Sequence, residues 1–140
     1  MQINYTHGVK MIILKRMKFK IDTREKFTMI TPESDFSSDN LTAEFKELIN
    51  SHMQHKTNLV ISLKNVANME ENCVKEIAAL QREFYEHNVS FVLCAIQPGV
   101  WNIIEQLELD DTINATPTET EAWDIVQMEE VERELLGDDK

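Results

Sequence analysis

Two adjacent carboxylates, Glu70 and Glu71, stand where a buried strand gives way to a helix. The strand is the apolar, β-branched run from 59 to 63, and a polar turn follows it from 64 to 68. In α/β sheets the carboxyl end of a strand, beside a helix N-terminus, is the usual place for function. Free N–H groups and the helix dipole stabilise an anion there by about 0.3–1 kcal/mol.

The carboxylate pair has a structural and a functional interpretation. Acidic residues are favoured in first helical turns for stability alone, whereas a partner could offer arginine or lysine to the same two charges. Acid–base catalysis would need a pocket and shifted pKa values, which no pattern here predicts. We predict that the partner-contact residues are Met69, Glu70, Glu71, Asn72 and Lys75. The structural alternative places Met69 in the core and Lys75 on a solvated face.

Four other side chains have metal-binding or nucleophilic chemistry. His52 and His55 are three residues apart, but they fall near an expected helix C-terminus, where imidazolium suits the dipole. Cys73 and Cys94 are interpreted as small buried hydrophobes, with a disulfide as the less favoured alternative. Since neither zinc-ligand spacing nor a glycine-rich phosphate loop occurs, the sequence predicts no metal and no cofactor.

The elements that position these residues alternate between strands and amphipathic helices. The first two strands, joined by the turn 23–26, predict a hairpin, and the later alternation predicts parallel pairing with right-handed crossovers. The expected fold is α/β, with a mostly parallel central sheet, a leading hairpin and four helices. Strands are expected at 17–22, 27–31, 59–63, 89–96 and 111–116, and helices at 41–53, about 70–84, 98–107 and 118–135.

The length of 140 residues predicts one domain, at 17–128. Residues 1–16 carry basic but no acidic side chains, and three methionines occur by position 17. We expect the native product to start at Met17 and residues 1–16 to be an extension, with an edge strand from Val9 to Leu14 as the alternative. Residues 129–140 are expected to form an acidic helix end and tail.

Charge and hydropathy limit the class of partner. The formal net charge of −11 repels nucleic-acid backbones, so we expect a protein partner and no nucleic acid. Apolar runs of four to seven residues are far shorter than a membrane span, and the N-terminus lacks the order of a signal peptide. The sequence therefore predicts a cytoplasmic protein without membrane insertion.

Four segments, in order and spacing, carry a resemblance to a known family. They are Glu33-Ser34-Asp35 with Leu41-Thr42-Ala43-Glu44-Phe45, then Leu59 to Val66, then Phe91 to Val100, and finally Leu107 to Asp110 followed by Ala122. From about Phe19 to Val126 the chain resembles a STAS domain, the fold of bacterial anti-sigma-factor antagonists. The resemblance implies a non-enzymatic module that binds a kinase-type anti-sigma factor and so releases the sigma factor.

In typical members the kinase phosphorylates a serine in an Asp-Ser-Ser-Gly turn at the start of the second helix, and a phosphatase reverses this. Aligned through Met69, the turn here is Glu70-Glu71-Asn72-Cys73, which places Glu71 at the phosphorylated position. Ser62 likewise replaces the usual aspartate of the central strand. With no hydroxyl in the turn, a phosphorylation switch cannot operate there, and Glu71 supplies a permanent negative charge.

Three hypotheses follow. The first is a regulatory binding module locked in one charge state. The second is a STAS-like accessory subunit of a membrane transporter, such as a lipid-export ATPase. The third is a small enzyme that would draw on His87, Cys94, Glu70 and Glu71.

Overall fold

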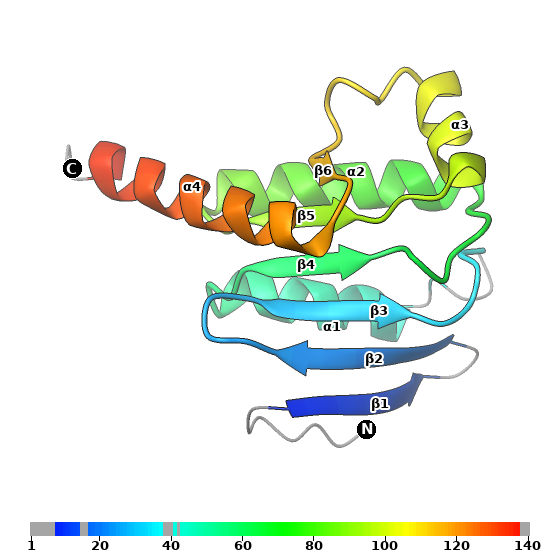
Figure 1. Ribbon diagram of the computed structural model, residues 1–140, viewed down its shortest axis with the longest axis horizontal. Coiled ribbons are helices and arrows are strands. Elements are labelled where there is room, and N and C mark those ends of the chain that lie inside the picture. Colours follow the sequence, from blue (N-terminus) through cyan, green and yellow to red (C-terminus); the bar gives the residue numbers. More distant parts are fainter. Residues whose placement is uncertain (1–7, 15–16, 38–40, 42, 138–140) are drawn as a thin grey trace.

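The strands of the central sheet lie side by side in the order in which they occur along the chain. The computed structural model describes residues 8–14, 17–37, 41 and 43–137, and Figure 1 shows the six strands as one layer. They are β1 (Gly8–Leu14), β2 (Met17–Thr23), β3 (Thr28–Pro32), β4 (Leu59–Ser62), β5 (Phe91–Cys94) and β6 (Ala115–Thr116). The helices are α1 (Ala43–Gln54), α2 (Glu71–Glu86), α3 (Pro98–Gln106) and α4 (Glu119–Gly137).

The direction of each strand pairing follows from the connection between the strands. Two residues separate β1 from β2 and four separate β2 from β3, and both pairs of strands run antiparallel. β3, β4, β5 and β6 pair in parallel, because α1, α2 and α3 carry the chain back to the same end of the sheet each time. The predicted α/β fold, with its leading hairpin, parallel pairings and four helices, is confirmed.

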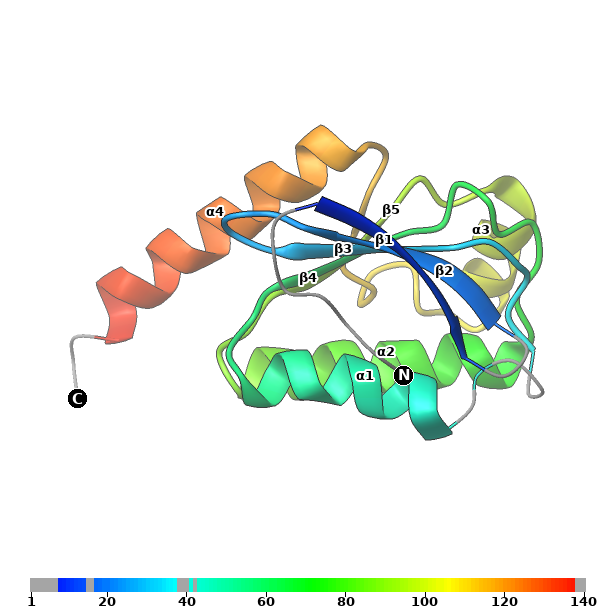
Figure 2. The same ribbon diagram turned by 90° about the horizontal axis from the view of Figure 1, so that it is seen from below.

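One face of the sheet, here the inner face, is covered by α1 and α2. Figure 2 shows the two helices lying together beneath the strands. Phe45 on α1 meets the rings of Phe19 and Phe36 edge-on, with centroid distances of 5.2 and 6.0 Å. The largest fully buried side chains include Phe19, Phe36, Phe45, Phe84, Ile30, Ile49, Ile61, Ile77 and Leu93, and all belong to this inner core.

The opposite, outer face is covered by α4 over part of its width. Figures 1 and 2 show α4 crossing β4 and β5 and continuing past the ends of the strands, while no described helix lies over β1 and β2 on this side. A second, smaller core cluster fills the space beneath α4. It consists of Phe27, Met29, Val60, Val92, Cys94, Ala122 and Val126.

The edge strand that the sequence offered as an alternative for residues 9–14 is present as β1, which pairs along its whole length with β2. Ile12 points to the inner face, opposite Phe19, and is buried. Residues 1–7 and 15–16 lie outside the described part of the chain, so the domain boundary at Met17 and the native start of the product stay predictions.

The last strand, β6, is shorter than predicted, because a side chain makes hydrogen bonds that the backbone of a longer strand would make. We expected a strand over 111–116, and the structure pairs only Ala115 and Thr116 with β5. The buried Gln81 amide of α2 donates to the backbone oxygens of Phe91 (3.1 Å) and Asn114 (2.9 Å) and accepts from Asn114 N–H (2.9 Å). It replaces the ladder bonds that a longer β6 would make.

The side chain of Thr118 caps the start of α4. The Thr118 hydroxyl accepts from the Glu121 N–H at 3.1 Å and donates to the Glu121 carboxylate at 3.2 Å. The charged end of α4 continues to Gly137, two residues past the predicted end at 135, and residues 138–140 lie outside the described part. None of the described helices combines the length and apolar character needed to span a bilayer.

Candidate functional site

The turn from Leu63 to Glu70 connects the central strand β4 to α2. It is anchored by two buried side chains, Leu63 and Val66, which belong to the inner core. Leu63 N–H donates to the Cys94 carbonyl of β5 at 2.9 Å, and Val66 N–H donates to the Leu63 carbonyl at 3.0 Å. The backbone of the turn is thus fixed to both central strands before it reaches the helix.

A carboxylate from the loop after β3 holds the middle of this turn. Asp35 accepts the backbone N–H groups of Ala67 (2.8 Å) and Asn68 (3.1 Å) and the Asn68 side-chain amide (3.3 Å). Desolvation acts to raise the pKa of Asp35, but the hydrogen bonds from Asn68 and Ala67 outweigh it and lower that pKa. The charged form of Asp35 is therefore the form that stabilises the turn.

The same loop adds a single rung of sheet beside the start of α2. Phe36 and Met69 form an isolated parallel bridge. Phe36 N–H donates to the Asn68 carbonyl at 3.1 Å, and Glu70 N–H donates to the Phe36 carbonyl at 2.9 Å. Both the Phe36 and the Met69 side chains are buried. Met69 therefore anchors the turn from the core side.

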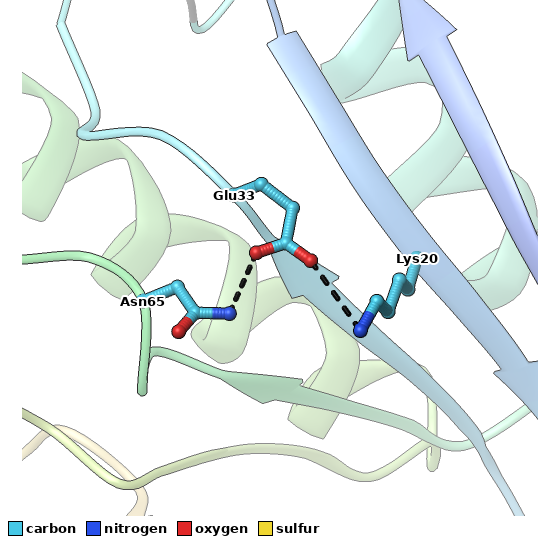
Figure 3. Close-up of polar contacts among 3 residues, drawn as sticks. All are labelled: Lys20, Glu33 and Asn65. Carbon is cyan, nitrogen blue, oxygen red and sulfur yellow. Dashed lines mark hydrogen bonds and ion pairs between the residues drawn. The ribbon is translucent and has the colours of Figure 1, made fainter.

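Two further contacts support the turn from the direction of β2. As Figure 3 shows, the Glu33 carboxylate accepts from the Asn65 side-chain amide (2.6 Å) and meets the Lys20 ammonium on its other oxygen (3.6 Å). The Lys20–Glu33 pair is partly exposed, so its contribution to stability is small. Its geometric effect is to join β2, the loop after β3 and the turn.

The start of α3 closes the turn from the other side. The Gln97 amide donates to the Lys64 carbonyl at 2.7 Å. Gly99 lies so close to the turn that a Cβ built on it would stand 2.7 Å from the Ala67 backbone oxygen. Pro98 occupies the first helical position, as predicted. Only a residue without a side chain fits at position 99 while the turn keeps its place.

The start of α2 is the exposed part of this assembly. Glu70 is the N-cap residue, with extended backbone angles (φ −66°, ψ 150°), and its carbonyl accepts from Cys73 N–H (3.0 Å) and Val74 N–H (3.1 Å). Glu71 lies in the first turn, where negative charge suits the helix dipole. Both carboxylates lie beyond the carboxyl end of the central strand β4, at the start of α2, as the sequence predicts.

The structure separates the predicted contact residues into one anchor and four surface groups. Met69 is 5% exposed and lies in the inner core. Glu70, Glu71, Asn72 and Lys75 are all exposed, and Glu71 and Lys75 lie one turn apart on the same side of α2. The available surface at this corner therefore comes from the two carboxylates, the amide and the lysine.

The side chains imagined as an enzyme site are not brought together. Glu70 and His87 cap opposite ends of α2, which places them about 26 Å apart along the helix. Cys94 is fully buried in the outer core. Burial, with Glu70 and Glu76 adding, raises the pKa of Cys73 to about 11, and burial raises the pKa of Cys94 to about 11 as well. Thiols of this kind are not thiolate nucleophiles near neutral pH.

The interpretation of both cysteines as buried free thiols is confirmed. The two histidines near the end of α1 are bound to their own helix: Nδ1 of His52 lies 2.9 Å from the Leu48 carbonyl, and Nδ1 of His55 lies 2.7 Å from the Ser51 carbonyl. Burial lowers the pKa of His52, so the expected imidazolium is not favoured there. Within the described ranges, His, Cys, Asp and Glu form no group of three suited to a metal ion.

Ser62, at the end of β4, is buried and faces away from the site. It lies opposite Cys94 on the neighbouring strand. Among the described residues its hydroxyl finds no nitrogen or oxygen partner. The position that resembles the family's strand aspartate is therefore a small buried hydroxyl whose polar neighbour in the outer core is the Cys94 thiol.

Sequence reasoning missed the residues that brace the turn. Asp35 and Glu33 come from the loop after β3, and Gly99 comes from the start of α3. Each lies about 30 residues from the turn, and no periodic pattern marks their contacts. The one signal near them is the polar Glu33-Ser34-Asp35 run, which in the sequence supports the family resemblance but predicts no contact with the turn. The fold and this braced corner together define a small α/β domain whose exposed feature is an acidic helix start.

This arrangement of strands, helices and turn belongs to a known family of domains. The sequence model of the STAS domain matches residues 18–122, which is most of the chain, and the chain belongs to the STAS domain family. No curated protein matches by sequence.

Solved structures support the same fold. A putative anti-sigma factor antagonist from Thermotoga maritima is similar at a TM-score of 0.69 and 14% identity, covering 78% of this chain and 94% of that one. An anti-sigma factor antagonist from Mycobacterium paratuberculosis is similar at 0.67 and 16%, covering 86% and 95%. Part of SLC26A9 is also similar, at 0.60 and 17%, covering 83% of this chain and 22% of that one.

Proposed function

We propose that the chain is a non-enzymatic regulatory binding module, of the anti-sigma-factor antagonist type, whose protein partner binds the exposed start of α2. The observation that carries this is the braced turn: it presents Glu70, Glu71 and Asn72 to solvent on a backbone held from three sides. A preformed surface binds with less loss of conformational entropy. The structural relatives named as anti-sigma factor antagonists support the same class.

The carboxylate of Glu71 gives this surface a fixed charge. In the family pattern that the sequence resembles, a serine at this position gains negative charge only when a kinase acts. Glu71 is negative without a kinase, although it has about half the charge of a phosphate and fewer acceptor oxygens. The surface therefore favours a partner that offers arginine or lysine. It disfavours a kinase-type anti-sigma factor that recognises only the uncharged turn.

A pull-down from extract of the native host tests the proposal. Tagged wild-type chain should recover a regulatory protein, with kinase-type anti-sigma factors among the candidates. Glu71→Lys should lose that protein, because it reverses the charge at the centre of the surface. Glu86→Lys makes the same charge change at the far end of α2 and should retain it. Equal recovery by all three proteins, or recovery of no regulatory protein, would count against the proposal.

A phosphorylation assay tests the fixed charge itself. We expect Glu71→Ser not to become a kinase substrate, because Glu70 and Cys73 also depart from the family turn and Cys73 is buried. The assay measures phosphate incorporation with a kinase-type anti-sigma factor from the same host. Phosphate found on residue 71 would show that the remaining turn is still recognised.

A second candidate is an accessory STAS-like subunit of a membrane transporter. The likeness to a segment of SLC26A9 favours it. Under both candidates the chain acts in the cytoplasm through a protein contact and without a cofactor. The genes next to this one separate the two: permease and ATPase genes favour the transporter, whereas kinase, phosphatase or response-regulator genes favour signalling.

A further inference from the structure

The outer face of β1 carries a row of exposed apolar side chains. Val9, Met11 and Ile13 are 60%, 45% and 70% exposed. Alternation puts them on the face opposite to the buried Ile12. In the register with β2, Met11 lies beside Lys20 and Ile13 beside Lys18, whereas Val9 lies beside Asp22, so basic side chains flank the Met11–Ile13 end of the apolar row. We call this surface the β1–β2 strip.

No described element covers the β1–β2 strip. α4 and the outer core reach only as far as β3, where Met29 is the last buried member. Figures 1 and 2 show the two first strands without a helix on the outer side. An amphipathic sheet buries its apolar face against another layer, and among the described residues that layer is missing over two of the six strands.

The second half of α4 carries a matching feature. Met128, Val131 and Leu135 follow a spacing of three and four residues, which places them along one side of the helix. They are 54%, 54% and 73% exposed. Glu132 and Glu134 lie on the two sides of this row and are exposed. We call the three apolar side chains the α4 stripe.

The orientation of the α4 stripe is fixed by polar contacts on the opposite side of the helix. Arg133 donates to the Ser90 hydroxyl at 3.1 Å, and Asn58 donates to the Glu130 carboxylate at 2.8 Å. Asn114 donates to the Glu129 carboxylate at 3.1 Å. These bonds hold the inner side of α4 toward the sheet, so the stripe points outward on a helix that extends past the strands.

We propose that the α4 stripe of one copy of the chain packs on the β1–β2 strip of a second copy. Both surfaces are apolar rows, and the lysines beside Met11 and Ile13 complement in charge the glutamates that flank the α4 stripe. The contact would cover the outer face of β1 and β2 with a helix, as α4 covers the outer face of the later strands. Since the two surfaces differ, two copies that exchange both contacts form a closed pair.

Sedimentation velocity on the full chain tests the contact. The wild type should associate in a concentration-dependent way. Ile13→Asp removes the strip and Leu135→Asp removes the stripe, and each should raise the dissociation constant at least about tenfold, because a charge replaces a central apolar contact. Both side chains are largely exposed, so the fold should be retained, which circular dichroism checks. Tyr85→Asp, at an 80% exposed aromatic on α2, is the matched control and should associate like the wild type.

Mixing the two variants distinguishes this contact from its alternatives. Ile13→Asp keeps a stripe and Leu135→Asp keeps a strip, so an equimolar mixture should form a one-to-one complex that neither variant forms alone. Association of Ile13→Asp alone would indicate helix-to-helix contact, and association of Leu135→Asp alone would indicate strand-to-strand contact. Either result, a monomeric mixture, or a wild type that stays monomeric up to about 1 mM, would overturn the proposal.

Charge reversal tests the flanking groups separately. Lys18→Glu should weaken association, because it places an added carboxylate against the glutamates of the stripe. Pairing Lys18→Glu on one chain with Glu134→Lys on the other should restore part of the loss. Lys64→Glu, at an exposed position on the turn after β4, should have no effect. Equal weakening by Lys18→Glu and Lys64→Glu would show that overall charge, and not this contact, controls association.

Discussion

The two faces of the sheet differ in how completely they are covered. The inner face packs against α1 and α2 and holds the large aromatic and aliphatic core. The outer face packs against α4 alone and holds a smaller cluster. The turn that presents Glu70 and Glu71 belongs to the inner side, because Val66 and Met69 are members of the inner core. The proposed partner surface is therefore built on the rigid side, and the proposed self-contact on the open side.

This difference teaches how one small domain can keep two surfaces apart. The proposed partner surface would need a fixed backbone, and its turn is tied to the larger core through Val66 and Met69. The self-contact needs exposed apolar area, which only an incompletely covered face provides. Each of the following predictions tests whether the inner side of the sheet contributes more to the stability of the fold than the outer side.

The largest effect should come from the aromatic centre of the inner core. Phe45→Ala removes the ring that meets Phe19 and Phe36 and should lower the free energy of unfolding by about 3–5 kcal/mol. Val126→Ala in the outer core removes two methyl groups and should cost about 1–3 kcal/mol. Urea unfolding measures both. A larger loss for Val126→Ala would reverse the comparison.

The next effect concerns the backbone contact between α3 and the turn. Gly99→Ala puts a Cβ against the Ala67 carbonyl, so the turn or α3 must shift, and we expect a loss of about 1–3 kcal/mol. Gly137→Ala, at the end of α4, meets no atom within 4 Å and is the control. Thermal unfolding compares the two variants. Equal melting temperatures would mean that the turn adapts without cost and is less rigid than described.

A smaller, pH-dependent effect is expected at Asp35. Its pKa is lower in the folded protein than the ordinary value, so its stabilising effect is present above the ordinary carboxyl pKa and disappears as the pH falls through the folded-state value. Asp35→Asn should cost about 0.5–1 kcal/mol at pH 7, because the group is exposed. The difference from wild type should shrink toward pH 3. A difference that is constant with pH would show that the charge of Asp35 does not matter.

The smallest effect should be a gain on the outer side. Ser62→Ala removes a buried hydroxyl without a nitrogen or oxygen partner among the described residues, and should raise stability by up to about 1 kcal/mol. Ser90→Ala removes a hydroxyl that accepts from Arg133 and should not stabilise. Chemical unfolding of both variants measures the contrast. A loss for Ser62→Ala would mean that the nearby Cys94 thiol already satisfies the hydroxyl.

Sequence periodicity predicted the elements well where they bury one clear face. The run 59–63 and the spacing of Cys73, Ile77 and Leu80 predicted β4 and α2 nearly as observed. They also predicted that the start of α2 follows the carboxyl end of β4. These patterns reflect local burial, which a single sequence records. The position of Glu71 at the start of α2 follows from that alone.

What the sequence could not give are contacts between segments far apart. The bridge between Phe36 and Met69 holds Met69 in the core, although the sequence offered it as a partner-contact residue. No local pattern near either residue predicts this bridge. The early end of the predicted last strand likewise depends on Gln81, some 33 residues from Asn114. Such pairs depend on how the chain is folded back, which periodicity does not encode.

The Gln81 amide has a practical consequence for labelling the protein. The Gln81 side chain supplies hydrogen bonds to the backbone next to β6. The exposed turn at Asp110 and Asp111 is therefore not needed for the pairing of β6 with β5. A guest peptide or a fluorescent reporter inserted there should be tolerated, as exposed loop tips generally are. Such a reporter would follow the encounter with a partner, or with a second copy, from a position on neither surface.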